Sequence, residues 1–440
     1  MIEAINNDAF LLFNFGGLNP WEFTGCRDEV LASKTTAYLG ACLMFSPIYD
    51  VKGPDAVKFL SSICVNDFSN MTDNAIRHAV ICNDKGQIMT DGVLFKVAED
   101  TFRTYWLNPV IAYLVSKSTM NVEGVEMSGR EYFYQIAGPR SLEILEAACE
   151  TDLHDIEFAR HRLTKIGGKD MRVVRLGMAG NLAYEVHGDI ADADSVYRRI
   201  WEVGQTFGAK KLAMVAYFLN HTEAGFPNIN MHYPLPWYED AGMAAFLAAM
   251  PPFVGYANNN RLLLGSVGDE LEPRFVTPYD LGWGSLVKFN HEFTGRAALE
   301  TIAANPPRTL ATLEWNAEDV AEVFASQFKG AAVTPYERID TPFDYNLNSV
   351  RPQYHADKVM VGEQQIGICS GRNISYYYNA MISLAFIDKK YAVEGTDVTV
   401  IWGTPGNPQK EIRAKVTRTP YNNLVRNEDT DVEAIPRFKG

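Results

Sequence analysis

Hydrophobic and polar residues alternate along residues 75–107, in runs that are separated by turn-forming residues. This period of two is typical of consecutive antiparallel strands. Three other segments, residues 53–64, 138–149 and 191–208, place their apolar residues at helical spacing, and Gly208 supplies a plausible stop for the last of them. Because strands and helices alternate without a long parallel repeat, the pattern favours an α+β fold.

The pattern changes in the second half of the chain. Residues 228–284 mix aromatic residues with Pro and Gly and fit no regular element, and consecutive prolines within residues 303–311 precede a series of strands with few helices. We therefore expect residues 1–305 to form a first region of two α+β subdomains and residues 306–425 to form a separate β-rich domain. The polar, acidic tail, residues 426–440, is expected to be a mobile end or an oligomer arm.

Composition narrows the class of protein. A chain of 440 residues with 47% hydrophobic residues can bury a large core and exceeds one typical domain. A net charge of -14 argues against a nucleic-acid partner or an anionic membrane, because either would need a concentrated basic face. No apolar run approaches the roughly 18 residues of a membrane span. The six cysteines form no Cys-x-x-Cys pair, so we expect reduced thiols and a cytoplasmic protein.

Several common catalytic motifs are absent from the sequence. It has no Gly-x-Gly-x-x-Gly at the start of a helix, no Walker loop and no Gly-x-Ser-x-Gly elbow. The eight histidines are dispersed, and none has the spacing of a metal site. We therefore predict no metal.

Three stretches, taken together, resemble the glycine-cleavage T-protein family of tetrahydrofolate-dependent one-carbon transferases. They are "RLGMAGNLAYEVHG" (residues 175–188), "TPYDLGWGSLVKFNHEFTGRAAL" (277–299) and the C-terminal run that begins "SGRNISYYYNAMISLAFID" at residue 370. Within that family the chain is most similar to the aromatic O-demethylases of the vanillate and 3-O-methylgallate type, above all in "AYFLNHTEAGFPNINMHYPLPWY" (216–238). The likeness covers nearly the whole chain.

The resemblance implies a T-protein-like cloverleaf with antiparallel sheets and a C-terminal β-barrel domain. It implies a methyltransferase that moves a methyl group from a methoxylated aromatic compound to N5 of tetrahydrofolate, giving a phenol and 5-methyltetrahydrofolate. Two other hypotheses stay open: a folate-dependent enzyme with an amine or sulfonium donor, and a folate-binding protein without turnover. Neither the donor nor the oligomeric state, monomer or homo-oligomer, can be read from the sequence.

The resemblance also implies cofactor-binding residues. A reduced pterin presents an amino group and a ring N–H on one edge, and a carboxylate can accept both hydrogen bonds. Glu185 is suited to that role, although a solvent-facing Glu on an edge strand is the alternative. Tyr184 would be a neighbouring wall or part of the core. Asp91 falls where T-proteins carry an aspartate near the reacting nitrogens, and the alternative is a turn or strand-end Asp satisfied by local backbone.

Tyr217 is the candidate catalytic residue. It matches the catalytic tyrosine of the O-demethylases, and a phenol of pKa about 10 can share its proton with a leaving phenolate of similar pKa. A core tyrosine is the alternative. His221 would orient a phenol oxygen or lie on the surface.

The remaining substrate-binding candidates are Trp237, which would give a flat wall or pack in an interdomain loop, and Phe45. Phe45 aligns with the histidine of the vanillate-type enzymes, and their arginine falls near Asn108, with no arginine in reach. Because a carboxylate buried without a cation is costly, we expect a methoxyarene that lacks the benzoate group, or one whose acid is held from elsewhere.

Overall fold

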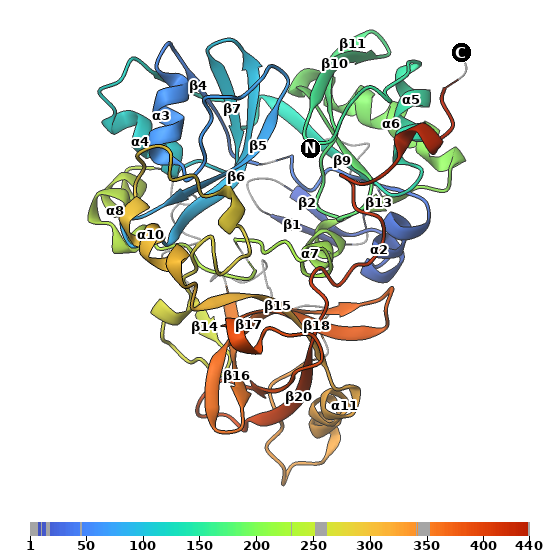
Figure 1. Cartoon of the computed structure of the whole chain (residues 1–440). Helices are drawn as coiled ribbons and strands as arrows, with labels where there is room; N and C mark the ends of the chain where they lie inside the picture. Colours follow the sequence, from blue (N-terminus) through green and yellow to red (C-terminus); the bar gives the residue numbers. More distant parts are fainter. Residues whose placement is uncertain are drawn as a thin grey trace.

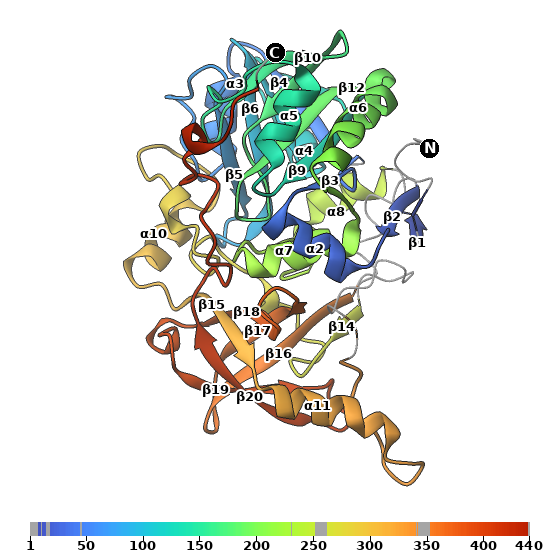
Figure 2. The same cartoon turned by 90° about the vertical axis from the view of Figure 1, so that its right-hand side faces the viewer.

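The computed structural model describes residues 8–9, 11–14, 18–44, 46–229, 231–250, 262–339, 341 and 353–438. Figure 1 shows two sheets side by side above a β-barrel. The turned view in Figure 2 places helices α2 (Cys26–Thr35) and α7 (Met214–Glu223) between the sheets and the barrel. This arrangement of mixed helices and antiparallel sheets confirms the predicted α+β class.

The first sheet has the strand order β5-β6-β7-β4-β8, and its pairings are antiparallel. Its strands are β4 (Ile48–Lys52), β5 (Ile76–Cys82), β6 (Ile88–Ala98), β7 (Thr101–Tyr105) and β8 (Glu123–Glu126). The helices that contribute to its core are α3 (Ala56–Ile63), α4 (Val110–Lys117), α8 (Ala241–Ala248) and α10 (Arg296–Ala304). The meander predicted over residues 75–107 is β5, β6 and β7, so that prediction is confirmed.

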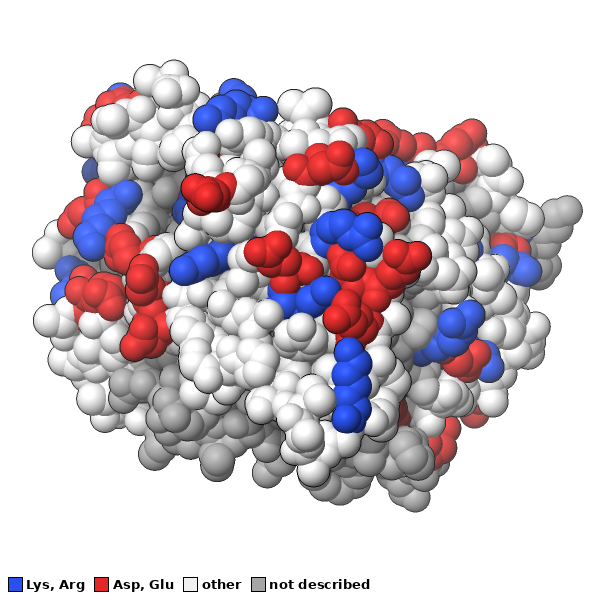
Figure 3. All heavy atoms as spheres, turned by 90° about the horizontal axis from the view of Figure 1, so that it is seen from below, with Lys and Arg blue, Asp and Glu red and all other residues white. Residues whose placement is uncertain are grey.

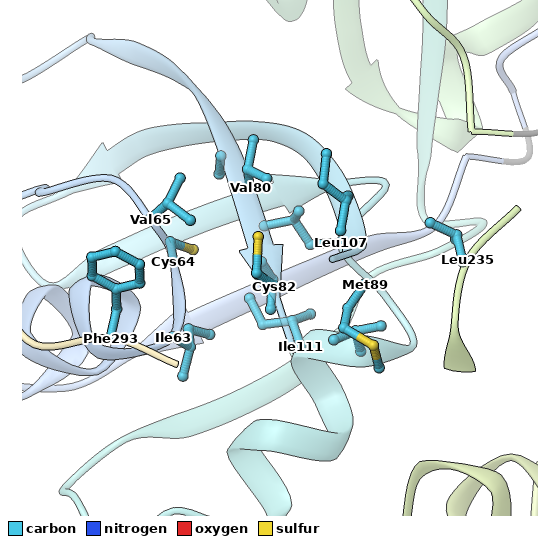
Figure 4. Packing of buried hydrophobic residues seen from close by; sticks show 14 of the residues in the cluster. Ile63, Cys64, Val65, Val80, Cys82, Met89, Leu107, Ile111, Leu235 and Phe293 are labelled. Carbon is cyan, nitrogen blue, oxygen red and sulfur yellow. The ribbon is translucent and has the colours of Figure 1, made fainter. Parts of the chain in front are cut away.

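A hydrophobic core fixes these elements. Figure 4 shows Ile63 of α3, Val80 and Cys82 of β5, and Ile111 of α4 packed close together, and all are buried. Burial of apolar surface stabilises such a cluster by roughly 25 cal/mol per Å². The core thereby holds β5 and β6, and both strands supply residues to the cavity described below.

The second sheet has the order β10-β11-β12-β9-β3-β13, and only its β3–β13 pairing is parallel. Its strands are β3 (Tyr38–Gly40), β9 (Glu131–Ala137), β10 (His161–Ile166), β11 (Lys169–Val174), β12 (Ala183–Asp189) and β13 (Lys210–Leu212). Helices α5 (Ser141–Cys149) and α6 (Ala193–Thr206) share a core with it. The helices predicted over residues 53–64, 138–149 and 191–208 are therefore α3, α5 and α6. Gly208, with φ of 75°, follows the last.

Six antiparallel strands form the barrel, which closes through the β16–β19 pairing. They are β15 (Arg308–Trp315), β16 (Gln353–Val361), β17 (Gln364–Ser375), β18 (Ala380–Asp388), β19 (Asp397–Trp402) and β20 (Lys410–Thr417), with helix α11 (Ala317–Ala325) beside them. The predicted C-terminal barrel is confirmed. Strand β14 (Leu262–Leu264) lies before the expected boundary at residue 305 but pairs in parallel with β16. The boundary itself stays a prediction.

Several short elements complete the description. They are β1 (Leu11–Asn14), β2 (Leu18–Glu22), η1 (Ile190–Asp192), η2 (Trp237–Glu239), η3 (Glu272–Arg274), η4 (Gly284–Leu286), η5 (Ser326–Phe328), η6 (Lys389–Tyr391) and η7 (Val432–Ala434). No helix of the described residues is both long enough and apolar enough to span a membrane. On the face seen in Figure 3, Lys and Arg side chains are interspersed with Asp and Glu.

The C-terminal tail packs against the second sheet instead of projecting as an arm. Arg175 donates to the carbonyl of Asn427 at 2.7 Å, and the amide of Phe438 donates to Glu146 at 2.9 Å. His154 lies 2.7 Å from Glu146 and 3.1 Å from the carbonyl of Ile435. Residues 427–438 therefore do not form the expected mobile end or oligomer arm. They form hydrogen bonds with buried polar groups of the second subdomain instead.

A buried ion pair joins α2 to α7 where both meet the barrel. Lys34 of α2 lies 3.2 Å from Glu223 of α7, and their side chains are 0% and 1% exposed. The hydroxyl of Ser375 on β17 donates to the same carboxylate at 2.8 Å. A charge so far from water needs its partner, so this contact restrains the position of α7 against the barrel.

We predict that Glu223→Gln destabilises the protein by about 3–5 kcal/mol, because Lys34 is left buried without a counter-charge. The double variant Lys34→Met/Glu223→Leu should recover most of that loss, since no charge remains to be desolvated. Urea unfolding of the wild type and both variants measures the difference. Equal losses in the single and double variants would contradict this account.

Candidate functional site

A cavity of about 930 Å³, counting its opening to solvent, is lined by both sheets and by α7. The first sheet contributes His78, Asp91, Gly92 and Val93, and the second contributes Phe133, Gln135 and Glu185. The other lining residues are Leu43, Trp106, Leu176, Met178, Met214, Tyr217, Phe218, His221, Phe226, Pro227, Asn228 and Ile229. Most walls are therefore apolar, with a few polar groups that converge, which is the usual character of a small-molecule site.

Glu185 lies in the cavity because of the alternation along β12. The loop before this strand turns back at Gly180, whose φ of 83° favours glycine. Successive side chains of a strand point to opposite faces. Glu185 accordingly lines the cavity beside Gln135, its cross-strand neighbour on β9. Tyr184 points to the other face and is buried in the hydrophobic core of the second sheet. Tyr184 is thus not a wall of the cavity but a core residue, which was the alternative stated above.

Asp91 lies across the cavity from the second sheet, and two side chains hold it. His78 Nε2 lies 2.9 Å from one oxygen, and the hydroxyl of Tyr233 donates to the other at 2.7 Å. These are side-chain partners, so the alternative of an Asp satisfied by local backbone is not what the structure shows. Neighbouring Gly92 leaves no room for a Cβ, which would lie 2.1 Å from the carbonyl of Tyr105.

Tyr217 and His221 lie one helical turn apart on α7, and both line the cavity. Their rings meet edge to face with centroids 4.8 Å apart. Burial raises the pKa of Tyr217 well above its ordinary value, and the nearby Cys42 and Glu185 raise it further. The phenol therefore keeps its proton at neutral pH.

The contacts of His221 fix its tautomer. Nδ1 lies 3.0 Å from the carbonyl of Phe226, which can only accept, so Nδ1 carries the hydrogen. Nε2 then presents a lone pair, 3.4 Å from the amide nitrogen of Asn228. Burial lowers the pKa of His221 to about 4, so the ring is neutral at pH 7. His221 lines the cavity and is buried, so it is not the surface histidine of the alternative.

The other predicted substrate residues lie elsewhere. Trp237 donates its indole N–H to the carbonyl of Met89 at 2.6 Å and packs in the first core, so it does not line the cavity. Asn108 donates to Glu126 at 2.8 Å and is also absent from the lining. Phe45 lies outside the described residues.

Sequence reasoning missed His78, Trp106 and Gln135. His78 belongs to the predicted meander, where its position two residues before Val80 gave no chemical signal. Trp106 lies in the turn after β7 and has φ of 71°, a conformation that a tryptophan rarely adopts. Pairing β12 with β9 would have identified Gln135, because it is the cross-strand neighbour of Glu185.

Among the described lining residues, neither Lys nor Arg occurs, while Asp91 and Glu185 are both present. The potential of the cavity is therefore set by two carboxylates. Three possible metal ligands, Glu146, Asp152 and His154, cluster elsewhere in the described residues, under the C-terminal tail. The predicted absence of a metal site stays a prediction.

The chain is similar to known proteins in sequence and in fold. Residues 6–233 match the model of the GCVT N-terminal domain. The chain is 54% identical to sesamin methylene transferase of Sinomonas sp. (strain No.22), over 99% of this chain and 97% of that protein. It is 29% identical to syringate O-demethylase of Sphingobium sp. (strain NBRC 103272 / SYK-6), over 92% and 90%. The crystal structure of glycine cleavage system aminomethyltransferase T from Bartonella henselae superposes with a TM-score of 0.68 at 16% identity, over 97% of both chains, and shows a common fold.

We predict that stability decreases as the pH falls from about 6.5 to about 4. The folded-state pKa of His221 is about 4, below the 6.5 of the unfolded chain, so the unfolded state binds more protons in this window. This histidine alone would remove about 3 kcal/mol by pH 4. In urea unfolding across that range, His221→Phe should show a smaller pH dependence than the wild type. Identical pH dependences would contradict the buried, neutral state of His221.

Proposed function

Because the chain belongs to the family of the GCVT N-terminal domain, we propose that it is a tetrahydrofolate-dependent O-demethylase of aromatic ethers. The reaction moves a methyl group from a methoxyarene to N5 of tetrahydrofolate and leaves a phenol. The observation that carries this proposal is one apolar cavity in which Glu185, Asp91 and Tyr217 converge. The names of two relatives, a methylene transferase and an O-demethylase, support one-carbon transfer.

A second candidate differs only in the one-carbon unit. The relative at 54% identity is named for transfer of a methylene group, whereas the O-demethylase is 29% identical. Sesamin is an arene with methylenedioxy groups, so the higher identity favours transfer of a methylene bridge from such an ether. Both versions break the bond between an ether oxygen and the one-carbon unit and leave that oxygen on the arene. Both therefore need a proton donor at oxygen and a proton acceptor at nitrogen.

The cavity residues fit a reduced pterin. Its edge presents N–H donors, and Glu185 offers a carboxylate beside Gln135, whose buried Oε1 has no hydrogen-bond partner in the described residues. Acceptors that lose water must regain a donor, so this pair is suited to a ligand that supplies several N–H groups. Trp106, Phe133 and Phe226 offer flat apolar surfaces for the ring systems.

Bound tetrahydrofolate would supply the nucleophilic nitrogen that takes the one-carbon unit. We assign Tyr217 as the proton donor to the aryl oxygen, because its raised pKa keeps the phenol protonated until that oxygen gains charge. We assign Asp91 to hold or accept the proton that leaves nitrogen, with His78 and Tyr233 keeping the carboxylate in place. The apolar walls exclude water and restrict the geometry, an effect that can reach about 7–11 kcal/mol in favourable cases.

The substrate class follows from charge. A benzoate in this cavity would meet two carboxylates and no Lys or Arg among the described lining residues. Desolvating a carboxylate without a cation costs several kcal/mol. We therefore assign a neutral methoxyarene or methylenedioxyarene as the donor.

We predict that anaerobic incubation of the protein with tetrahydrofolate and a neutral aryl ether gives a phenol and a one-carbon tetrahydrofolate, read by mass spectrometry. The product mass distinguishes 5-methyl- from 5,10-methylenetetrahydrofolate. Tyr217→Phe should lower kcat about 10²–10⁴-fold without loss of tetrahydrofolate uptake, because only proton donation is removed. Tyr197→Phe is the matched control, since Tyr197 is a buried tyrosine outside the cavity whose hydroxyl has no partner in the described residues.

Three results of this experiment would contradict the proposal. Calorimetry that detects no tetrahydrofolate uptake would exclude the folate role. Uptake without product from any aryl ether would favour an amine or sulfonium donor, or binding without turnover. Full activity of Tyr217→Phe would remove Tyr217 from the chemistry.

We also predict that kcat/KM for a neutral guaiacol or methylenedioxybenzene exceeds that for vanillate by at least about tenfold, because one unpaired buried carboxylate costs more than 1.4 kcal/mol. The two compound classes are compared at the same pH with saturating tetrahydrofolate. Equal values would show that a cation reaches the substrate from outside the described lining.

A further inference from the structure

A chain of buried hydrogen bonds runs from the cavity into the second sheet. Glu185 and His187 lie on the same face of β12, and His187 Nε2 lies 3.2 Å from the Glu185 carboxylate. His187 Nδ1 lies 2.8 Å from the hydroxyl of Tyr105, which in turn lies 2.9 Å from Glu131. Glu185, His187 and Tyr105 are 4%, 2% and 1% exposed, so water does not replace these contacts.

The three contacts need three hydrogens, one for each. A neutral histidine brings one hydrogen and a tyrosine brings one, whereas two ionised carboxylates bring none. Burial and Glu131 raise the pKa of Tyr105 well above its ordinary value, so the tyrosine supplies its hydrogen and no more. One additional proton must therefore reside on Glu131, Glu185 or His187.

Glu131 is the least suitable site for that proton. Its other oxygen pairs with the guanidinium of Arg103, which also binds Asp50 through two contacts of 2.7 and 2.8 Å. A carboxylate that accepts from a guanidinium is stabilised in its charged form. Tyr105 then donates to Glu131, and its oxygen accepts from His187 Nδ1–H.

The surroundings of His187 suit a cation better than a neutral ring. The ring stacks on Phe95 with centroids 5.5 Å apart and meets Phe133 at 4.4 Å, and aromatic rings attract a cation at such distances. Arg172, its cross-strand neighbour on β11, opposes the charge, but Arg172 Nη1 turns to His161 Nδ1 at 2.5 Å. His161 is neutral, because burial and Arg172 lower its pKa to about 4.

The charges that contact this cluster are compatible with an imidazolium. Its carboxylates are Asp50, Glu131 and Glu185, and its guanidinium groups are Arg103 and Arg172. A neutral His187 would leave three negative charges against two positive ones. A protonated His187 makes the numbers equal, which lowers the cost of burial.

We propose that His187 is a positioning residue that carries two ring protons and clamps Glu185 as a carboxylate facing the cavity, ready for the N–H edge of a reduced pterin. This inference rests on the proposed function for its ligand. The hydrogen bonds of His187 use one Glu185 oxygen and leave the other free, and the extra proton stays on the histidine instead of neutralising the acceptor.

Long-range ¹H–¹⁵N spectra of the ¹⁵N-histidine-labelled full chain test the proton directly. At neutral pH His187 should show the imidazolium pattern, with its signals among the eight histidines identified by their loss in His187→Gln. Tyr105→Phe should convert the ring to the neutral pattern, because one of its acceptors is gone. Tyr134→Phe is the matched control: it also removes a buried hydrogen bond, to the carbonyl of Ala193 at 2.7 Å, but lies outside the chain. A neutral His187 in the wild type would overturn the proposal.

Calorimetry with tetrahydrofolate tests the positioning role. His187→Gln should bind it at least about tenfold more weakly at neutral pH, because a charged donor is replaced by a neutral one. Equal affinity in both proteins would overturn the role. No uptake even by the wild type would instead overturn the proposed function, while the spectra still decide where the proton lies.

Discussion

Two carboxylates in one apolar cavity are the constraint on which the rest of the site depends. Asp91 comes from the first sheet and Glu185 from the second, and no Lys or Arg lines the described part of the cavity. Buried carboxylates need donors, and each of these two has a histidine as its neighbour. His78 lies 2.9 Å from Asp91 and His187 lies 3.2 Å from Glu185. Because His187 contacts only one oxygen of Glu185, that carboxylate keeps an acceptor for a donor-rich ligand.

Helix α7 brings the third element of the site to these carboxylates. It carries Tyr217 and His221 one turn apart, and its last residue, Glu223, is tied to Lys34 and Ser375 at the junction with the barrel. The barrel contributes none of the lining residues named above, yet it contacts the chain just after the loop of residues 226–229, which lines the cavity. His232, after that loop, lies 3.1 Å from the Thr222 hydroxyl, which donates to Gly371 at 3.0 Å. The barrel thus contributes to the site by fixing the positions of α7 and of the chain that follows it.

The sequence predicts those parts that depend on local periodicity and on motifs, and fails where long-range packing decides. The meander, the three helices and a β-rich C-terminal domain follow from apolar spacing. The closure of that domain into a barrel follows from the family resemblance, as do Glu185, Asp91, Tyr217 and His221, which line one cavity. The alternation along β12 already separates Tyr184 from Glu185, so that error was avoidable. Trp237 and the tail were not predictable, because the carbonyl of Met89 and the buried Arg175 that hold them lie far away in the chain.

Proton balance links these groups to the chemistry. Transfer of a methyl group from an aryl ether to a secondary amine removes one proton from nitrogen and delivers one to oxygen. Tyr217 keeps its proton because burial raises its pKa. His221 stays neutral because burial lowers its pKa to about 4, and its Nε2 presents a lone pair because Nδ1 carries the hydrogen. The same desolvation therefore prepares a donor and an acceptor 4.8 Å apart between ring centroids on one helix. With Asp91 on the facing sheet, the cavity contains both ends of the proton transfer, so the reaction does not need bulk water to carry the proton.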